Sequence, residues 1–90
     1  MNDRLTGIDT FVQTVDAGSF ALAAERLGLT RSAVGKTIAR LEQRLGTRLF
    51  QRTTRQQNLT EDGQAYYERC VRALAELDAA EAAFDSGRRE

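Results

Sequence analysis

Several residue types are missing or scarce in this 90-residue chain, and each absence excludes a class of protein. The sequence has no histidine, no glycine-rich phosphate loop, no metal-ligand cluster and no nucleophile beside a base, so we expect no enzyme activity, no metal and no cofactor. The single cysteine, Cys70, makes no internal disulfide and requires no oxidising compartment. No run approaches the roughly 18 apolar residues of a membrane span, and no secretory signal opens the chain, so we expect a cytoplasmic protein with no membrane partner.

Proline and tryptophan are also absent, whereas alanine, leucine, glutamate and arginine fill much of the chain. These four residue types are good helix formers, so the composition favours a mainly α fold. Ninety residues provide one small domain with a thin core, and we therefore expect oligomerisation to add stability.

The net charge of zero conceals an uneven distribution of charge along the chain. Residues 26–55 carry eight basic side chains and a single acid, Glu42, which gives this segment a net charge of +7. The flanking segments, 1–25 and 56–90, are acidic, with net charges of −3 and −4. A basic middle between acidic flanks indicates a surface that contacts nucleic acid.

Two helices are predicted at the N-terminal end of the chain. The first follows from apolar residues at three- and four-residue steps: Leu5, Ile8, Phe11, Val12 and Val15. Gly18 can take the left-handed conformation that closes this helix. Ser19 is then the expected N-cap of a short second helix over residues 20–27, which Gly28 ends.

The third predicted helix, residues 31–45, begins after a short turn that contains Gly28. Thr30 is its expected N-cap, and Gly46 closes it. One face is expected to lie in the core: Val34, Ile38, Leu41 and Leu45. The opposite face is polar and basic, with Gly35 at its edge: Ser32, Lys36, Ala39, Arg40 and Gln43. A short helix, a tight turn and a longer helix with a basic outer face form a helix-turn-helix unit.

The sequence changes character after this helix, and residues 49–59 predict a small β-hairpin wing. Leu49 and Phe50 begin a strand, the polar run 52–58 forms the tip, and Leu59 returns to the core. Thr60 is then the expected N-cap of a fourth helix. We therefore expect a winged helix-turn-helix domain, a three-helix core plus the wing, over residues 1–60 and a linker helix over residues 61–90.

The predicted linker helix carries a stripe at alternating three- and four-residue steps: Tyr67, Cys70, Leu74, Leu77, Glu81 and Phe84. Sustained over about three heptads, this is the period of a helix that pairs with another helix. The stripe could instead fold back onto its own domain. About 24 helical residues reach about 36 Å, which is longer than so small a core needs, so we favour a partner helix.

The chain resembles the LysR-type DNA-binding domain over nearly its whole length. The segments that carry the resemblance, in order and spacing, are residues 17–20, 23–27, 30–38, 41–42, 45–46, 48–55 and 59–63. The resemblance implies three helices and a wing that bind DNA, and a long linker helix that pairs two subunits and leads to a C-terminal ligand-sensing domain. No such domain follows here, which implies a fragment of a longer regulator or an unusually short relative.

The resemblance implies sequence-specific binding of double-stranded DNA by a bacterial, nucleoid-associated transcriptional regulator. The recognition helix, residues 31–45, would enter the major groove, and the wing, residues 49–59, would meet the minor groove or the backbone. A homodimer would bind an interrupted inverted repeat, with a higher oligomer if the full protein has a C-terminal effector domain. Three residues depart from the family's common pattern, Gly35 for serine, Arg31 for glutamine and Lys36 for arginine, so no base preference is carried over.

The DNA-binding residues expected on these grounds are Thr30, Arg31, Ser32, Gly35, Lys36, Arg40, Arg52, Thr54 and Arg55. We expect Arg31, Ser32 and Lys36 to meet base edges and Arg40 to meet a phosphate. Arg52 and Arg55 flank the wing tip and are expected at the minor groove. The alternatives are an ordinary solvated helix face and a solvated hairpin.

The residues expected to form the dimer contact are Tyr67, Cys70, Leu74, Leu77 and Phe84. Glu81 fits this apolar stripe badly. A winged helix that binds a protein instead of DNA is the competing function, and the +7 segment argues against it.

Overall fold

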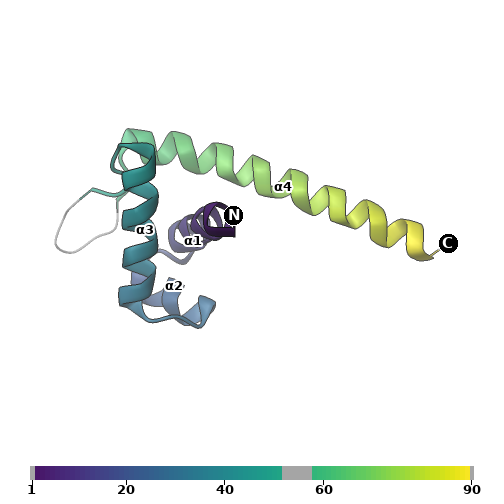
Figure 1. Ribbon diagram of the computed structural model, residues 1–90, viewed down its shortest axis with the longest axis horizontal. Helices are drawn as coiled ribbons and strands as arrows, with labels where there is room; N and C mark the ends of the chain where they lie inside the picture. Colours follow the sequence, from purple (N-terminus) through teal and green to yellow (C-terminus); the bar gives the residue numbers. More distant parts are fainter. Residues whose placement is uncertain (1, 52–57, 90) are drawn as a thin grey trace.

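The computed structural model describes residues 2–51 and 58–89, with side chains described over 4–51 and 58–85. The described residues form four helices: α1 (Asn2–Ala17), α2 (Phe20–Leu27), α3 (Arg31–Leu45) and α4 (Glu61–Arg89). The first three gather at one end, and α4 leaves them as a long arm, so the molecule measures 53 × 25 × 23 Å (Figure 1). None of the helices in the described ranges combines the length and hydropathy that crossing a membrane requires.

The three predicted N-caps are confirmed, and each uses a hydroxyl oxygen as the acceptor. The Ser19 side chain accepts from an amide in the first turn of α2, and the Thr30 side chain does the same for α3, both at 3.0 Å. Thr60 Oγ1 accepts from the Gly63 amide at 2.9 Å at the start of α4. Each cap satisfies an amide that the helix itself leaves without a partner.

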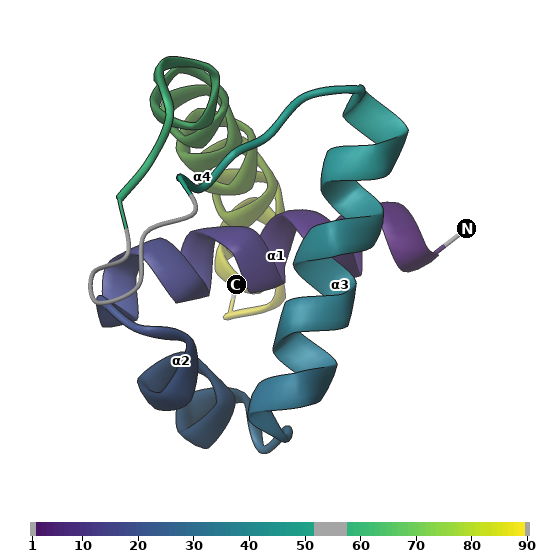
Figure 2. The same ribbon diagram turned by 90° about the vertical axis from the view of Figure 1, so that its left-hand side faces the viewer.

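The predicted C-terminal ends of α2 and α3 are confirmed as well. Gly28 and Gly46 have φ values of 71° and 74°, in the left-handed region that favours glycine. Their amides donate to carbonyls in the preceding turn. The chain therefore reverses sharply after α2, and α3 can pack across α1 (Figure 2).

Phe11 lies at the centre of the core, where α1 meets the wing base and α4. Its ring contacts the rings of Phe50, Tyr66 and Tyr67 at centroid distances of 5.6, 5.7 and 6.4 Å. The buried cluster around it draws on all four helices and on the segment after α3: Phe11, Val12, Ala24, Val34, Ile38, Leu41, Leu49, Phe50 and Cys70. Residues before and after the helix-turn-helix therefore share one core.

Leu45, which was predicted in the core, is exposed instead. It is 39% exposed at the last residue of α3, and Leu5, which belongs to the apolar stripe of the first helix, is 53% exposed in the first turn of α1. Both residues lie near the end of their helix. Helical period predicts which face is apolar, but it does not say how far the neighbouring element reaches.

The base of the predicted wing is present. Phe50 and Leu59 form an antiparallel bridge, the Gln51 amide donates to the Asn58 carbonyl at 2.7 Å, and the Thr60 amide donates to the Leu49 carbonyl at 3.0 Å. The expected tip residues Arg52, Thr54 and Arg55 lie outside the described residues. Residues 49–51 and 58–60 are therefore paired where they leave the core.

The start of α4 lies directly against the wing base. A Cβ built on Gly63 would come within 2.1 Å of the Leu49 carbonyl oxygen, which is far inside van der Waals contact. Thr60 Oγ1 also donates to the Arg48 carbonyl at 2.6 Å. Glycine at position 63 thus permits a backbone-to-backbone approach that no other residue allows without displacing one of the two segments.

Candidate nucleic-acid interface

The exposed side chains of α3 include four of the residues predicted to contact DNA. Ser32, Lys36 and Arg40 lie on the outer face, opposite the face that is buried in the core, and Arg31 is exposed at the first residue of the helix. Figure 2 shows α3 crossing α1 at the edge of the helical cluster. The structure therefore leaves all four side chains accessible to a partner.

Three exposed cations of α3 are free to contact a ligand. Arg31, Lys36 and Arg40 make no ion pair and no side-chain hydrogen bond with another residue in the described part of the chain. Arg44 is different, because it lies near Tyr66 of α4. Burial raises the pKa of Tyr66, and the Arg44 guanidinium acts in the opposite direction. Arg44 thus faces α4.

Gly35 lies at the edge of the outer face of α3, with open space beside its backbone. A Cβ built at this position would have no heavy atom within 4 Å, so nothing in the protein's own packing requires glycine here. Glycine in a helix interior costs about 1 kcal/mol relative to alanine. Because glycine has no side chain, the backbone of α3 can approach a bound surface more closely here than it could with any other residue at position 35.

Thr30 precedes the first residue of α3, where its hydroxyl can both accept and donate a hydrogen bond. Its hydroxyl oxygen accepts from the Ala33 amide at 3.0 Å, and the side chain is exposed. A hydroxyl that accepts one hydrogen bond still has its own proton to donate. Thr30 can therefore cap α3 and donate to an acceptor such as a phosphate oxygen at the same time.

Glu42, the single acid of the basic segment, ties α3 to the wing base. Its Oε2 accepts from the amides of Leu49 and Phe50, at 2.8 and 3.3 Å. Sequence reasoning missed this role, because the acceptor and its donors are seven and eight residues apart and meet only after the chain turns at Gly46. Glu42 thus holds the wing base against the recognition helix.

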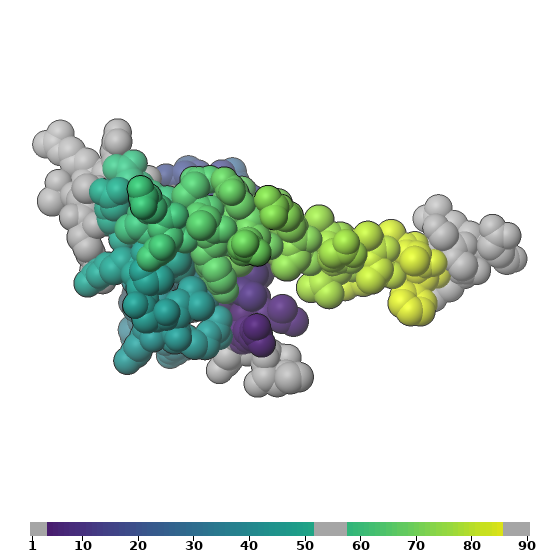
Figure 3. All heavy atoms as spheres, turned by 90° about the horizontal axis from the view of Figure 1, so that it is seen from above, coloured from purple at the N-terminus to yellow at the C-terminus, as the bar shows by residue number. Residues whose placement is uncertain are grey.

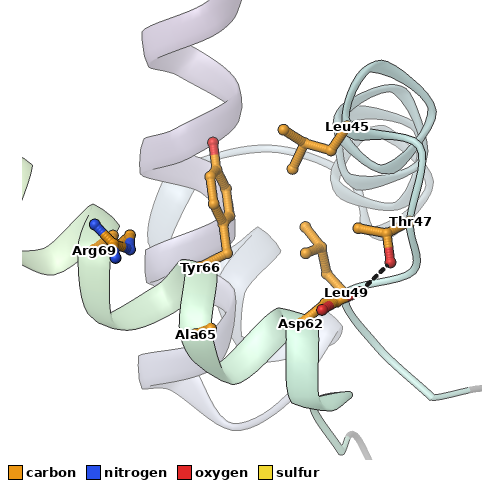
Figure 4. Close-up of a pocket in the computed structure, with 7 residues that line it drawn as sticks. All are labelled: Leu45, Thr47, Leu49, Asp62, Ala65, Tyr66 and Arg69. Carbon is orange, nitrogen blue, oxygen red and sulfur yellow. Dashed lines mark hydrogen bonds between the residues drawn. The ribbon is translucent and has the colours of Figure 1, made fainter.

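A second polar contact joins the end of α3 to the first turn of α4. Thr47 Oγ1 donates to Asp62 Oδ2 at 2.6 Å, beside a pocket of about 410 Å³ (Figure 4). The exposed Leu45 side chain faces this pocket from one side and Tyr66 from the other (Figure 4). The recognition helix, the wing base and α4 are therefore connected at one junction.

The predicted dimer stripe on α4 is divided between the protein's own core and solvent. Cys70 is 4% exposed and belongs to the core cluster, and Tyr67 and Leu74 are partly buried against it. Leu77 and Phe84 are 45% and 70% exposed. This half of the stripe therefore packs on the protein's own core, where burial raises the pKa of the Cys70 thiol, and the expected place of Cys70 in a subunit contact stays a prediction.

The described residues contain no group of three or more histidine, cysteine, aspartate or glutamate side chains placed to hold a metal. The exposed surface of α3 carries hydrogen-bond donors and positive charge, and α4 carries exposed apolar side chains.

Known proteins resemble this chain in both sequence and fold. Residues 5–64 match the family described as "Bacterial regulatory helix-turn-helix protein, lysR family". An HTH-type transcriptional repressor of Pseudomonas aeruginosa is 47% identical over 85 residues, which cover 94% of this chain and 27% of the relative. The regulator CrgA of Neisseria meningitidis is 50% identical over 74 residues, covering 82% of this chain and 25% of CrgA.

A solved structure of the BenM DNA-binding domain in complex with benA site 1 DNA has a TM-score of 0.86 and 27% identity. The alignment covers 96% of this chain and 94% of that one. The chain spans about a quarter of the length of the curated relatives named above. Because the family pattern matches residues 5–64, which include the whole helix-turn-helix, and because relatives reach this level of identity, the chain belongs to the LysR family of bacterial regulatory helix-turn-helix proteins.

Proposed function

We propose that this chain is the DNA-reading module of a bacterial LysR-type transcriptional regulator and binds double-stranded DNA with sequence specificity. The observation that carries the proposal is the set of exposed, unpaired cations on α3. The chain would act in the cytoplasm, at the nucleoid, through binding and without catalysis. The fold it shares with the BenM domain bound to DNA supports this role.

The N-terminal half of α3 is the part proposed to enter the major groove. There Arg31 and Lys36 would contact the paired acceptors of guanine, and Ser32 would contact a base edge with less discrimination. Thr30 would donate to a phosphate, and Arg40, further along α3, would contact another. Gly35 would allow the helix backbone to lie close to the DNA.

The wing is proposed to lie along or within the minor groove beside each recognition helix. Arg52 and Arg55 would enter that groove, where the negative potential is strongest in A·T-rich sequence, and Thr54 would contact the backbone. Glu42 supports this arrangement, because it holds the wing base to α3 and fixes where the hairpin starts.

A homodimer formed through the exposed part of α4 is proposed as the binding unit. Leu77 and Phe84 are large apolar side chains on a helix that the rest of the chain leaves uncovered. Two such domains would place two recognition helices on an interrupted inverted repeat. If the full protein carries a C-terminal effector domain, that domain would add further subunit contacts.

The first experiment selects bound duplexes from a random DNA pool and then measures affinity for the preferred site at several salt concentrations. Lys36→Ala and Arg31→Ala should each cost about 1–3 kcal/mol on the preferred site and relax the base preference at one or two positions. Arg40→Ala should weaken binding to all sequences alike and reduce the salt slope by about one unit.

Arg72→Ala is the matched control, because Arg72 is an exposed arginine on α4, away from the outer face of α3. It should change neither affinity nor base preference. If the unmodified chain binds no duplex at low salt, or if Arg72→Ala loses as much affinity as Lys36→Ala, the proposed function is wrong.

A further inference from the structure

Contacts hold the first turn of α4 against the rest of the chain, but these contacts alone do not fix the direction of the helix axis. Asp62 contacts Thr47, and the Gly63 backbone lies against Leu49, so the first turn of α4 is attached to the junction. Two attachment points along a rigid rod are needed to fix the direction in which it points. In Figure 3 the first half of α4 lies over the helical cluster and the second half extends beyond it.

The second attachment point is a hydrogen bond between α4 and α1. The Tyr67 hydroxyl donates to Asp16 Oδ1 at 2.5 Å, across a sequence separation of 51 residues. This hydrogen bond joins the last turn of α1 to the first half of α4. The contact raises the pKa of Tyr67, chiefly through the hydrogen bond to Asp16, so the hydroxyl keeps its proton and remains a donor.

The other contacts between α1 and α4 are apolar and do not specify one orientation. The Phe11 ring contacts the rings of Tyr66 and Tyr67, and Leu74 packs at the edge of the same cluster. Apolar packing is non-directional, whereas a hydrogen bond prefers one distance and one angle. Asp16 also lies in the last turn of α1, next to the turn that leads into the helix-turn-helix.

The geometry of α4 amplifies any change at this contact. From Tyr67 to Phe84 the helix extends by about 26 Å, at 1.5 Å per residue. A swing of about 10° around Tyr67 therefore moves the far end of the arm by about 4–5 Å, more than the 3.4 Å step between neighbouring base pairs. The direction of α4 thus determines where a subunit joined through residues 77–84 would place its own recognition helix.

We propose that Tyr67 and Asp16 are positioning residues that select the half-site spacing at which the protein binds DNA. This inference rests on the proposed function, because only a dimer on DNA has a spacing to select. The two side chains touch no DNA. They fix the direction of the arm that connects the two recognition helices.

The test uses duplexes that carry the same two half-sites with spacers that differ by one base pair. The unmodified chain should prefer one spacer. Tyr67→Phe should reduce that preference by about fivefold, the change in equilibrium that one net hydrogen bond supplies. Its affinity for a duplex with a single half-site, and its ranking of bases within a half-site, should stay as in the unmodified chain.

Three further variants separate this role from a general loss of packing. Tyr66→Phe removes a hydroxyl from the neighbouring position of α4, where it faces Cys70 and Arg44, and should keep the spacer preference. Asp16→Asn retains an oxygen that can accept from Tyr67 and should keep it too. Asp16→Ala lacks this acceptor and should behave like Tyr67→Phe.

The outcomes distinguish this inference from the proposed function. If Tyr67→Phe keeps the full spacer preference, or if Tyr66→Phe loses as much of it, the inference is overturned and the proposed function stands. If the unmodified chain binds no duplex, the proposed function is wrong and this inference falls with it.

Discussion

The junction, formed by residues 42–50 and 59–63, contrasts with the two surfaces that flank it, the outer face of α3 and the second half of α4. At the junction, Glu42, Thr47 and Thr60 all have partners within the chain, and Gly63 brings two backbones together. On α3, Arg31 and Lys36 have none among the described residues, and on α4 the side chains of Leu77 and Phe84 lie in solvent.

This contrast separates the parts of the sequence that specify the fold from those available to partners. A substitution at the junction should cost folding free energy, because it removes contacts that exist in the isolated chain. A substitution on either flanking surface should leave folding nearly unchanged, since exposed changes are usually within about 0.5 kcal/mol. Its effect should appear only when DNA or a second subunit is present.

Gly63→Ala should have the largest effect of any variant at the junction. The added Cβ would meet the Leu49 carbonyl, which is backbone and cannot rotate away, so either α4 or the wing base must move. We expect a loss of about 3 kcal/mol or more in the free energy of unfolding, measured by urea titration with far-UV circular dichroism. A loss below about 1 kcal/mol would show that the start of α4 shifts easily and that the junction is not rigid.

Leu77→Glu and Leu74→Glu compare the two halves of α4 directly. Leu77→Glu should leave the unfolding free energy of the monomer unchanged. It should weaken dimerisation by about 3 kcal/mol, because each of the two subunits loses one buried leucine from the apolar contact. Leu74→Glu should also destabilise the fold, since Leu74 is partly buried against the core.

Light scattering over a dilution series measures the association of these two variants, and urea titration of each variant measures its folding. Equal effects on folding for both variants would contradict the division of the stripe. A monomeric unmodified chain well above micromolar concentration would contradict dimerisation through this helix.

Glu42→Ala should cost about 1–3 kcal/mol of unfolding free energy, because the Leu49 and Phe50 amides lose their acceptor. Glu42→Gln keeps one acceptor oxygen and should lose less. Hydrogen exchange gives the specific readout: the amides of residues 49 and 50 should exchange faster in Glu42→Ala, while those in the interior of α2 should not. Unchanged exchange at these two amides would rule out the role assigned to Glu42.

Gly35→Ala should have the smallest effect and the opposite sign. The site has open space for a methyl group, and alanine is the better helix former, so stability should rise by about 1 kcal/mol. Affinity for the preferred DNA site should fall, because the methyl group separates the backbone of α3 from the DNA. A rise in both stability and affinity would show that Gly35 has no part in binding.

The sequence predicts the helix ends well, because caps depend on chemistry within a few residues. Ser19 and Thr30 each lie three residues before the amide they cap, and Gly28 and Gly46 adopt the backbone conformation that glycine favours. The wing base was predicted from a different local pattern, in which apolar residues flank a polar run, and Phe50 and Leu59 do form an antiparallel bridge.

The contacts that organise the junction and the arm could not be predicted in this way. The bonds from Glu42 to the wing base and from Tyr67 to Asp16 join residues whose distance depends on how whole elements pack. The helical period of the α4 stripe also could not show which of its residues pack on the protein's own core and which stay exposed. The same spacing of apolar residues suits packing on the core and packing on a second helix. The roles of Arg52, Thr54 and Arg55 at the wing tip remain predictions.

The attachment of α4 through Gly63 and Asp62 has a mechanical consequence. A long α-helix transmits torsion along its axis, and here its fixed end contacts Leu49 of the wing base and Thr47 at the end of α3. A torque applied anywhere along the arm is therefore delivered to α3 and to the wing base at one place. The wing base and α3 should turn together as one rigid unit, so strain from the arm would change the tilt of this unit and leave the position of the wing base on α3 unchanged.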